Sequence, residues 1–470
     1  MSSLTDLVRG CTFDDFLFTP QYSVVERRDP AAIDLTSRLT EHLWLKRPIV
    51  SANMDTVTRA DMAVAMAEEG GIGIIDRGFR SGEIEPQVRE VQIVKRTQHG
   101  IINDPYTIGP HEPLTEAAAR MSRTGVGTLV VVDENARLAG LLTTRDLRFA
   151  ALTGDVASRM TPRERLITHT GVPGAPVAEQ AMLANKIKKL PFATRDDHGR
   201  LRVGAAIGAK GDYLERAAEL LRAGADVIVI DIAHGHSTVM ARAIEAFRQR
   251  FPRIELIAGK VATAEGVTFL KERGVNGIKI GIGPGGGCTT RLNTNFCVPQ
   301  VQALAKCRAA AGARIPLTAD GGVKRHGAVV QALLFGGDTV MLGSVLAGTT
   351  ETPGETVQKP VVVPDSNKTV RVPFKVFRGM ASLQAIVDRL DVEDAEAADV
   401  EALGAEGMEV SVPARGSVRP LLRDMYRHLC SAISYGGAKS LRELQEMFGQ
   451  DPARYVIRLT ESSRRESFDR

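Results

Sequence analysis

The chain has 470 residues, of which 43% are hydrophobic and 25% charged, the balance of a folded protein with more than one domain. Its net charge of +4 is small for this length and argues against a nucleic-acid partner. The five cysteines form no Cys-x-x-Cys pair, which argues against a cysteine zinc site and a disulfide framework. Because the sequence also has neither a signal-peptide-like start nor an apolar run of about 18 residues, we expect a cytoplasmic protein with no membrane partner.

Short apolar runs, each ending in small or polar residues, predict buried parallel strands. They cover residues 48–54, 71–76, 203–209, 227–233, 256–261, 277–283, 317–322 and 339–344. Segments with helical spacing lie between several of them, at 213–223, 237–251 and 264–273. Alternation of strand and helix over eight strands predicts an α/β fold of the (β/α)8 barrel (TIM barrel) type, whose active site gathers at the C-terminal ends of the strands.

About 125 residues separate the second and third predicted strands, where a barrel needs only one helix. Within them we expect a helix at 113–122, strands at 128–132 and 138–142, and a helix that opens at 143–146. This pattern predicts an α+β module inserted in a barrel loop, with an incomplete second repeat near 177–191. The predicted domains are the first part of the barrel (1–95), the inserted module (96–202), and the rest of the barrel with a flap and C-terminal segment (203–470).

The most specific feature is the loop 281–291, in which five of the seven residues before Cys288 are glycine. Glycine lets a ligand approach the backbone closely, and free backbone groups can cradle ions. A cysteine is usually a packing residue. Here it follows a barrel strand at its C-terminal end, which favours a thiol poised as a nucleophile.

The chain resembles the IMP dehydrogenase/GMP reductase family over nearly its whole length. The resemblance is carried by residues 48–58, 70–75, 281–291, 319–322, 341–344, 378–380 and 406–407. The insertion resembles the paired CBS module of that family, most clearly at 140–146.

The resemblance implies that Cys288 attacks C2 of a purine mononucleotide and that Thr290 relays a proton at that carbon. It implies that Asp320 binds the ribose hydroxyls, and that Gly322, Gly343 and Ser344 form the phosphate cradle. The remaining implied substrate contacts are Ser51, Met54, Gly379 and Met380. The implied contacts to a nicotinamide cofactor, NADPH or NAD(H), are Asp231, Ala233, Gly281 and Gly283. A potassium ion (K+) is implied at the carbonyls of Gly283, Gly285 and Cys288.

Three departures from the family pattern bear on the phosphate. Gly286 replaces a serine and Phe377 replaces a tyrosine, so two hydroxyl donors are lost. Lys260 replaces an asparagine and adds a positive charge, which we hypothesise compensates for them.

Two reactions of the family share the covalent intermediate. A GMP reductase expels ammonia from GMP and delivers hydride from NADPH to give IMP; an IMP dehydrogenase oxidises IMP to XMP with NAD and needs an activated water. The dehydrogenases carry an Arg-Tyr pair on a flap, but here Leu390 follows Arg389 in the stretch 387–399. Asp231-Ile-Ala233 is also closer to the reductases, and Glu406 matches a carboxylate that works with the threonine on the leaving amine. The sequence therefore favours GMP reductase.

Other features keep alternatives open. His234-Gly-His236 and the inserted module are more typical of the dehydrogenases. Lys260, Gly286, Phe377 and the altered stretch 293–297 fit a catalytically weak nucleotide-binding paralogue. CBS pairs bind ATP or GTP, and Asp146 matches a ribose-binding aspartate, although the second repeat lacks an equivalent. The family implies a homotetramer, or an octamer formed through the CBS module.

Overall fold

The structure is a computed structural model, and it describes residues 4–29, 31–97, 105–124, 126–147, 152–166, 168, 190–362, 369–390 and 404–468. The chain divides into two compact units, one formed by Met1–Lys95 with Leu190–Arg470 and the other by Arg96–Lys189. Most of the predicted second repeat, residues 177–189, lies outside the described residues. Among the described residues, no helix is long and apolar enough to cross a membrane.

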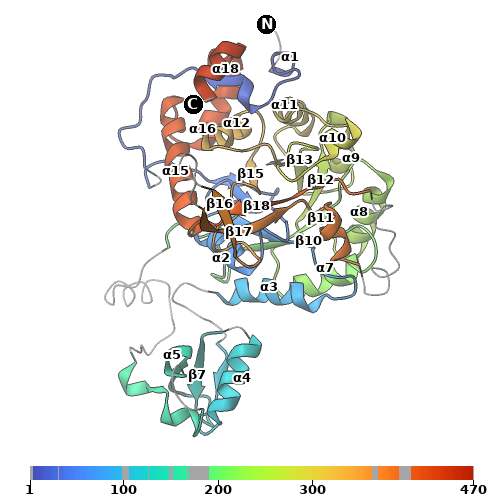
Figure 1. Cartoon of the computed structure of the whole chain (residues 1–470). Coiled ribbons are helices and arrows are strands. Elements are labelled where there is room, and N and C mark those ends of the chain that lie inside the picture. The colour runs from blue at the N-terminus through green and yellow to red at the C-terminus, as the bar shows by residue number, and fades with distance from the viewer. Residues whose placement is uncertain are drawn as a thin grey trace. The chain divides into compact units, whose positions relative to one another are not determined.

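The first unit is a closed barrel of eight parallel strands, which confirms the predicted fold class (Figure 1). In order around the barrel, the strands are β10 (Val203–Ile207), β11 (Val227–Asp231), β12 (Leu256–Val261), β13 (Gly277–Ile280), β14 (Leu317–Asp320), β15 (Thr339–Leu342), β4 (Ile49–Ser51) and β5 (Ile72–Ile75).

Helices surround the strands because side chains alternate between the two faces of each strand. On β5, Ile72 and Ile74 pack inside the barrel, and Ile75 packs outward against the helical layer. The helices that follow the strands are α2 (Ala60–Glu68), α3 (Glu85–Arg96), α7 (Tyr213–Arg222), α8 (Thr238–Arg250), α9 (Ala264–Lys271), α11 (Gln300–Ala311), α12 (His326–Leu334) and, after β15 and a small sheet, α15 (Val418–Tyr435).

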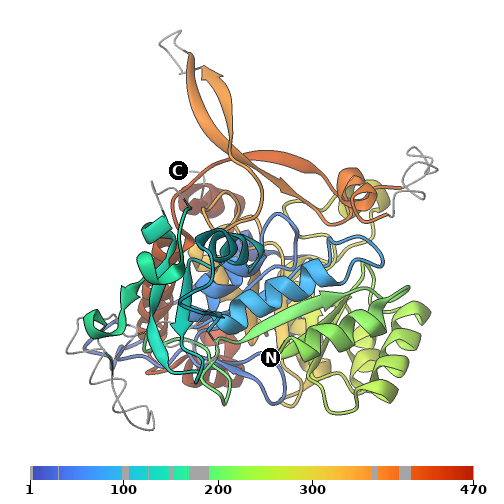
Figure 2. The ribbon, with the colours of Figure 1, turned by 90° about the horizontal axis from the view of Figure 1, so that it is seen from below.

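The two ends of the barrel differ. A hairpin of β2 (Ser37–Arg38) and β3 (Trp44–Leu45) covers the N-terminal end, where Leu39, Leu43 and Leu45 join the interior cluster. At the C-terminal end the chain forms loops, two short helices, α10 (Thr290–Thr294) and α13 (Leu383–Val387), and a three-stranded sheet of β16 (Val357–Val362), β17 (Thr369–Arg378) and β18 (Glu409–Pro413). Figure 2 shows the β16–β17 hairpin projecting from the barrel.

The remaining elements of this unit are short or C-terminal. They are α1 (Leu4–Leu7), a 3-10 turn at Phe13–Asp15, β1 (Phe16–Phe18), α16 (Leu441–Gln450), α17 (Pro452–Tyr455), β19 (Val456–Arg458) and α18 (Glu461–Phe468). Strand β1 pairs with β19, which joins the two ends of the chain.

The second unit is a small α+β structure with the strand order β6-β7-β8-β9. Its elements are β6 (Thr107–Ile108), α4 (Leu114–Thr124), β7 (Thr128–Val132), β8 (Leu138–Thr143), α5 (Thr144–Leu147), β9 (Thr161–Pro162) and 3-10 turns at Val156–Ser158 and Arg163–Arg165. Residues 190–202, predicted to belong to the insertion, lie with the barrel instead. Thr194 explains the difference, because its amide donates to the Ala67 carbonyl and its hydroxyl to that of Gly70.

Candidate active site

A cavity of about 260 Å³ opens where the C-terminal ends of the barrel strands meet the loops that follow them. Its lining brings together nearly all of the residues singled out in the sequence. They are Met54, Asp231, Ala233, Gly281, Gly283, Gly285, Cys288, Thr290, Asp320, Gly322, Gly343, Ser344, Gly379, Met380 and Glu406. Residues separated by more than 300 positions thus share one pocket because the barrel places all strand ends on one face.

Ser51 is the exception among the predicted substrate contacts. Its side chain is fully buried, and its hydroxyl accepts a hydrogen bond of 2.8 Å from the hydroxyl of Thr58. Successive side chains of an extended chain point to opposite sides, so Ala52, and not Ser51, contributes to the cavity lining. The prediction that Ser51 contacts the substrate is therefore not supported by its position.

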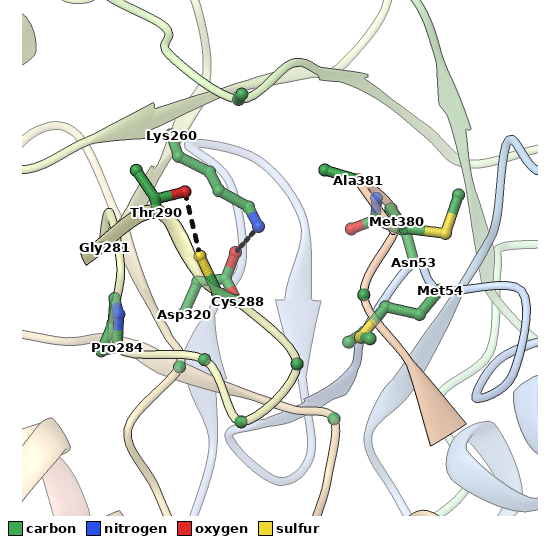
Figure 3. Close-up of a pocket in the computed structure, with 18 of the residues that line it drawn as sticks. Asn53, Met54, Lys260, Gly281, Pro284, Cys288, Thr290, Asp320, Met380 and Ala381 are labelled. Atoms are coloured by element: carbon green, nitrogen blue, oxygen red, sulfur yellow. Dashed lines mark hydrogen bonds and ion pairs between the residues drawn. The ribbon is translucent and has the colours of Figure 1, made fainter. Parts of the chain in front are cut away.

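The predicted nucleophile lies in a short chain of hydrogen bonds. The Cys288 thiol donates to the Thr290 hydroxyl over 3.2 Å, as Figure 3 shows, and that hydroxyl donates to Glu406 Oε2 over 2.6 Å. These contacts connect the thiol to a carboxylate through one hydroxyl. A proton can therefore move between sulfur, hydroxyl and carboxylate without a large rearrangement.

Backbone pairing explains how Glu406 reaches a loop 116 positions earlier in the chain. The Thr289 amide donates to the Glu406 carbonyl over 2.9 Å, and the Met408 amide donates to the Gly287 carbonyl over 3.0 Å. Gly379 also lies against this loop: a Cβ atom at that position would come within 2.3 Å of the Gly287 carbonyl oxygen. Glycine at 379 is therefore required for the close approach of the two segments.

A buried lysine, which the sequence analysis did not single out, lies between two carboxylates of the pocket. Lys279 on β13 is only 2% exposed, and its ammonium lies 2.9 Å from Asn53 Oδ1, 3.3 Å from Asp231 Oδ1 and 3.2 Å from Asp320 Oδ2. Arg77 adds a contact of 3.4 Å to Asp231 Oδ2. Burial alone would raise the pKa of Asp231, but Lys279 and then Arg77 lower it well below its usual range, so this carboxylate is ionised.

The Asp320 carboxylate lines the cavity beside two ammonium groups. Its Oδ2 receives no hydrogen bond from any residue in the described part of the chain, although two ammonium groups lie near it. Oδ2 itself is buried, and the side chain is 13% exposed where it lines the cavity, so a ligand hydroxyl can reach the carboxylate only from that side. The residue thus fits the ribose-binding role that the resemblance implies.

Lys260 lies beside this carboxylate. Its ammonium is 3.8 Å from Asp320 Oδ2, and Figure 3 shows the side chain reaching toward Asp320 close to the Cys288 thiol. Asp320 raises the pKa of Lys260, with Asp231 and Cys288 acting in the same direction and burial opposing them. Lys260 is therefore a cation, and its ammonium group faces Asp320, the residue predicted to bind the ribose.

Gly286 and Phe377, the two positions at which a hydroxyl is lost, both line the cavity. A Cβ atom at Gly286 would lie 3.3 Å from both Cβ and Oγ of Ser344, so the Ser344 side chain already occupies the adjoining space. The Ser344 hydroxyl, itself a predicted phosphate contact, therefore lies next to the position at which the hydroxyl is lost. Phe377 is 3% exposed and contributes an apolar ring to the wall.

The segment that follows Met380 is held against the pocket. Arg389 lines the cavity and donates to the Met380 carbonyl over 2.8 Å, and burial lowers its pKa to about 10. Leu390 has no polar group with which to activate a water. The rest of the predicted flap, residues 391–399, lies outside the described residues.

One cavity of the barrel holds a cysteine, a Thr–Glu pair and a carboxylate that could bind a ribose. These groups are typical of an enzyme that acts on nucleotides. Residues 10–469 match the IMP dehydrogenase / GMP reductase domain. The chain therefore belongs to this family of oxidoreductases that act on purine nucleotides and use a nicotinamide cofactor.

Some relatives are named as IMP dehydrogenases and others as GMP reductases. An inosine-5'-monophosphate dehydrogenase of Aquifex aeolicus is 40% identical, covering 97% of this chain and 94% of the relative. A GMP reductase of Leishmania major is 39% identical, covering 99% and 98%. A solved structure, a cysteine-to-alanine variant of the Trypanosoma brucei GMP reductase in complex with guanosine 5'-monophosphate, is 37% identical, with 97% of each chain covered and a TM-score of 0.82.

Proposed function

We propose that the chain is a GMP reductase, which converts GMP and NADPH to IMP, ammonia and NADP+ through a covalent bond between Cys288 and C2 of the purine. The observation that carries this proposal is the 2.6 Å hydrogen bond between Thr290 and Glu406 beside the Cys288 thiol. Expelling ammonia requires a proton donor at the leaving amine, and this pair supplies one. Position 390 is a leucine and not the tyrosine of the dehydrogenases. This also supports a reductase, because the reductase reaction needs no activated water.

The proton balance of the first step follows from this chain of contacts. The Cys288 thiol gives its proton to Thr290 as Thr290 passes its own to Glu406, and the resulting thiolate adds to C2. Glu406 then returns the proton through Thr290 to the amine nitrogen, which leaves as ammonia with the C–N electron pair. A C–S bond has replaced a C–N bond, and the thiol proton ends on the ammonia.

The binding residues complete the proposed site. Asp320 would hold the ribose hydroxyls, while the backbone at Gly322, Gly343 and Ser344, with the Ser344 hydroxyl, would hold the phosphate. Met54, Gly379 and Met380 would contact the nucleotide. These groups orient C2 toward the Cys288 sulfur and exclude water from it.

The cofactor residues fit a nicotinamide because Asp231, Ala233, Gly281 and Gly283 line the same cavity as Cys288. The Asp231 carboxylate, fixed by Lys279 and Arg77, retains lone pairs for a ribose hydroxyl. When bound, the nicotinamide supplies the hydride that replaces sulfur at C2. K+ would be held by the carbonyl oxygens of Gly283, Gly285 and Cys288, which are ligands that replace the hydration shell of this ion.

IMP dehydrogenase is the second candidate, favoured by the 40% identity to the Aquifex aeolicus enzyme of that name. The Thr290–Glu406 pair can also accept a proton from a water that attacks the adduct. The two reactions are separated by giving the purified protein GMP with NADPH, or IMP with NAD, and following nicotinamide absorbance. We expect turnover with GMP and NADPH; turnover with IMP and NAD alone contradicts the reductase, and nucleotide binding without turnover identifies a weak paralogue.

We also propose that the inserted unit binds ATP or GTP as a CBS-type module and that the chain forms a homotetramer or octamer. The support is the resemblance of residues 140–146 to CBS modules. In the described half, Asp146 Oδ2 accepts from the amide and hydroxyl of Thr143, both over 2.7 Å, so one carboxylate oxygen remains for a ligand.

A further inference from the structure

A second cluster of chemically competent side chains lies on the outer helical layer. His326 begins α12, and Asp424 and His428 lie one turn apart on α15. The two histidine Nδ1 atoms are 2.8 Å apart, and Asp424 Oδ2 lies 3.8 Å from His326 Nδ1 and 3.6 Å from His428 Nδ1. Within the described ranges, this is the one group of three or more His, Cys, Asp or Glu residues whose ligand atoms converge in this way.

The chemistry of the three groups suits a metal ion. Neutral imidazole and carboxylate are ligands for zinc and neighbouring divalent ions. Two imidazole nitrogens in hydrogen-bond contact cannot both carry a proton, and the Nδ1 atoms of His326 and His428 are in such contact. At least one ring is therefore neutral, which is the form that binds metal. Asp424 has no ion-pair partner other than these histidines among the residues that the structure describes.

The distances also suit a metal. In a tetrahedral zinc site with bonds of about 2.0–2.1 Å, neighbouring ligand atoms are about 3.3–3.4 Å apart. The three separations here, 2.8, 3.6 and 3.8 Å, lie on either side of that value, so small side-chain rotations bring all three atoms onto one ion. His326 is 25% exposed and the other two side chains about half exposed, so an ion can enter and a water can complete the coordination.

We propose that His326, Asp424 and His428 form a binding site for a divalent transition-metal ion, with Zn2+ as the best match, and that a water fills its fourth position. The helices that present the ligands lie against each other (Figure 1). His326 is four residues after Gly322, in the segment that leaves the predicted phosphate loop. A bound ion would therefore link the start of α12 to α15 and stabilise the packing of these two helices on the barrel.

The test uses the full-length Cys288→Ala protein, so that zinc does not bind the active-site thiol. After chelation and desalting, ZnCl2 is titrated by calorimetry, and the melting temperature is measured with and without zinc. We expect one equivalent to bind and to raise the melting temperature. His428→Gln and, separately, Asp424→Asn should weaken this binding by more than tenfold, while His198→Gln, at an exposed histidine outside the cluster, should not change it.

Unchanged zinc affinity in both His428→Gln and Asp424→Asn would overturn the proposal, as would failure of the parent protein to bind zinc. Both substitutions are at half-exposed side chains, and circular dichroism of the zinc-free variants confirms that they fold. Since no readout depends on turnover, failure of this site is distinguishable from failure of the proposed reductase activity.

Discussion

Aspartates are used differently in the two units of the chain. In the inserted unit, Asp146 bonds to Thr143, three residues earlier, and its contact is part of the local start of a helix. In the barrel pocket, Asp231 and Asp320 are held by Lys279, which also reaches Asn53 across 226 positions of sequence. The local arrangement can form in any α+β unit, whereas the pocket exists only once the barrel has closed. Chemistry that depends on several fixed charges is therefore expected in the barrel, and the insertion is expected to modulate it at most.

The largest expected effect comes from removing the sulfur. Cys288→Ala should lower turnover by more than about 10³-fold, because Cys288 provides the one thiol among the described residues that line the pocket. Nucleotide binding, measured by calorimetry, should persist. Cys297→Ala, at a half-buried cysteine near the same loop, is the matched control and should keep turnover within a few-fold. Substantial turnover in Cys288→Ala would exclude the covalent mechanism.

Glu406→Gln should have the next largest effect. It preserves the size of the side chain but removes the group that stores the thiol proton, so kcat should fall by about 10²–10⁴-fold with little change in the nucleotide KM. The loss should appear in ammonia release, followed in a single turnover. Glu409→Gln, on the neighbouring strand β18, should behave like the parent enzyme. A Glu406→Gln enzyme as fast as the parent would remove the main support for the proposed proton relay.

Sequence patterns predicted the barrel well because each strand is a continuous apolar run and each run ends where side chains change character. They also identified Cys288 and its glycines, since an unusual local composition needs no tertiary information. The resemblance to a known family supplied Glu406. Its position beside Thr290 follows from the pairing of residues 406–408 with the cysteine loop, which no local pattern encodes.

Lys279, Arg77 and Asn53 were missed because their roles depend on which strands become neighbours in the closed barrel. A signal for Lys279 was present: it is the single charge in the apolar stretch 277–283. A lysine in a strand buried on both faces needs anionic partners, and such a position is a candidate for the site. Ser51 is buried and its neighbour Ala52 lines the cavity, because one step along an extended chain turns a side chain to the opposite face.

Lys260→Ala should have a smaller effect than either catalytic substitution. The Lys260–Asp320 pair is 3.8 Å long and partly exposed, and Lys279 remains beside Asp320 after the change. Such pairs contribute little, so we expect the nucleotide KM to rise about two- to fivefold with kcat nearly constant. Lys210→Ala, at an exposed lysine in the loop after β10, is the control. An unchanged KM would show that Lys260 does not assist nucleotide binding.

The smallest expected effect on turnover comes from the inserted unit. Asp146→Ala removes the acceptor for the Thr143 amide and hydroxyl and should destabilise that unit by about 1 kcal/mol, as loss of a helix cap does. Hydrogen exchange at the Thr143 amide would measure this loss. Turnover without ATP or GTP should stay within twofold of the parent, because the residues that carry the chemistry all belong to the barrel unit.

Repeating that assay with ATP or GTP tests whether the insertion regulates the barrel. If the module binds these nucleotides through Asp146, any change they cause in turnover should disappear in Asp146→Ala and in a chain whose residues 98–188 are replaced by a short flexible linker. The replacement stops before residue 190 because Thr194 and Asp196 bond to the barrel unit. A nucleotide effect that persists in both variants would have to arise in the barrel pocket itself, where ATP or GTP would compete with the substrate.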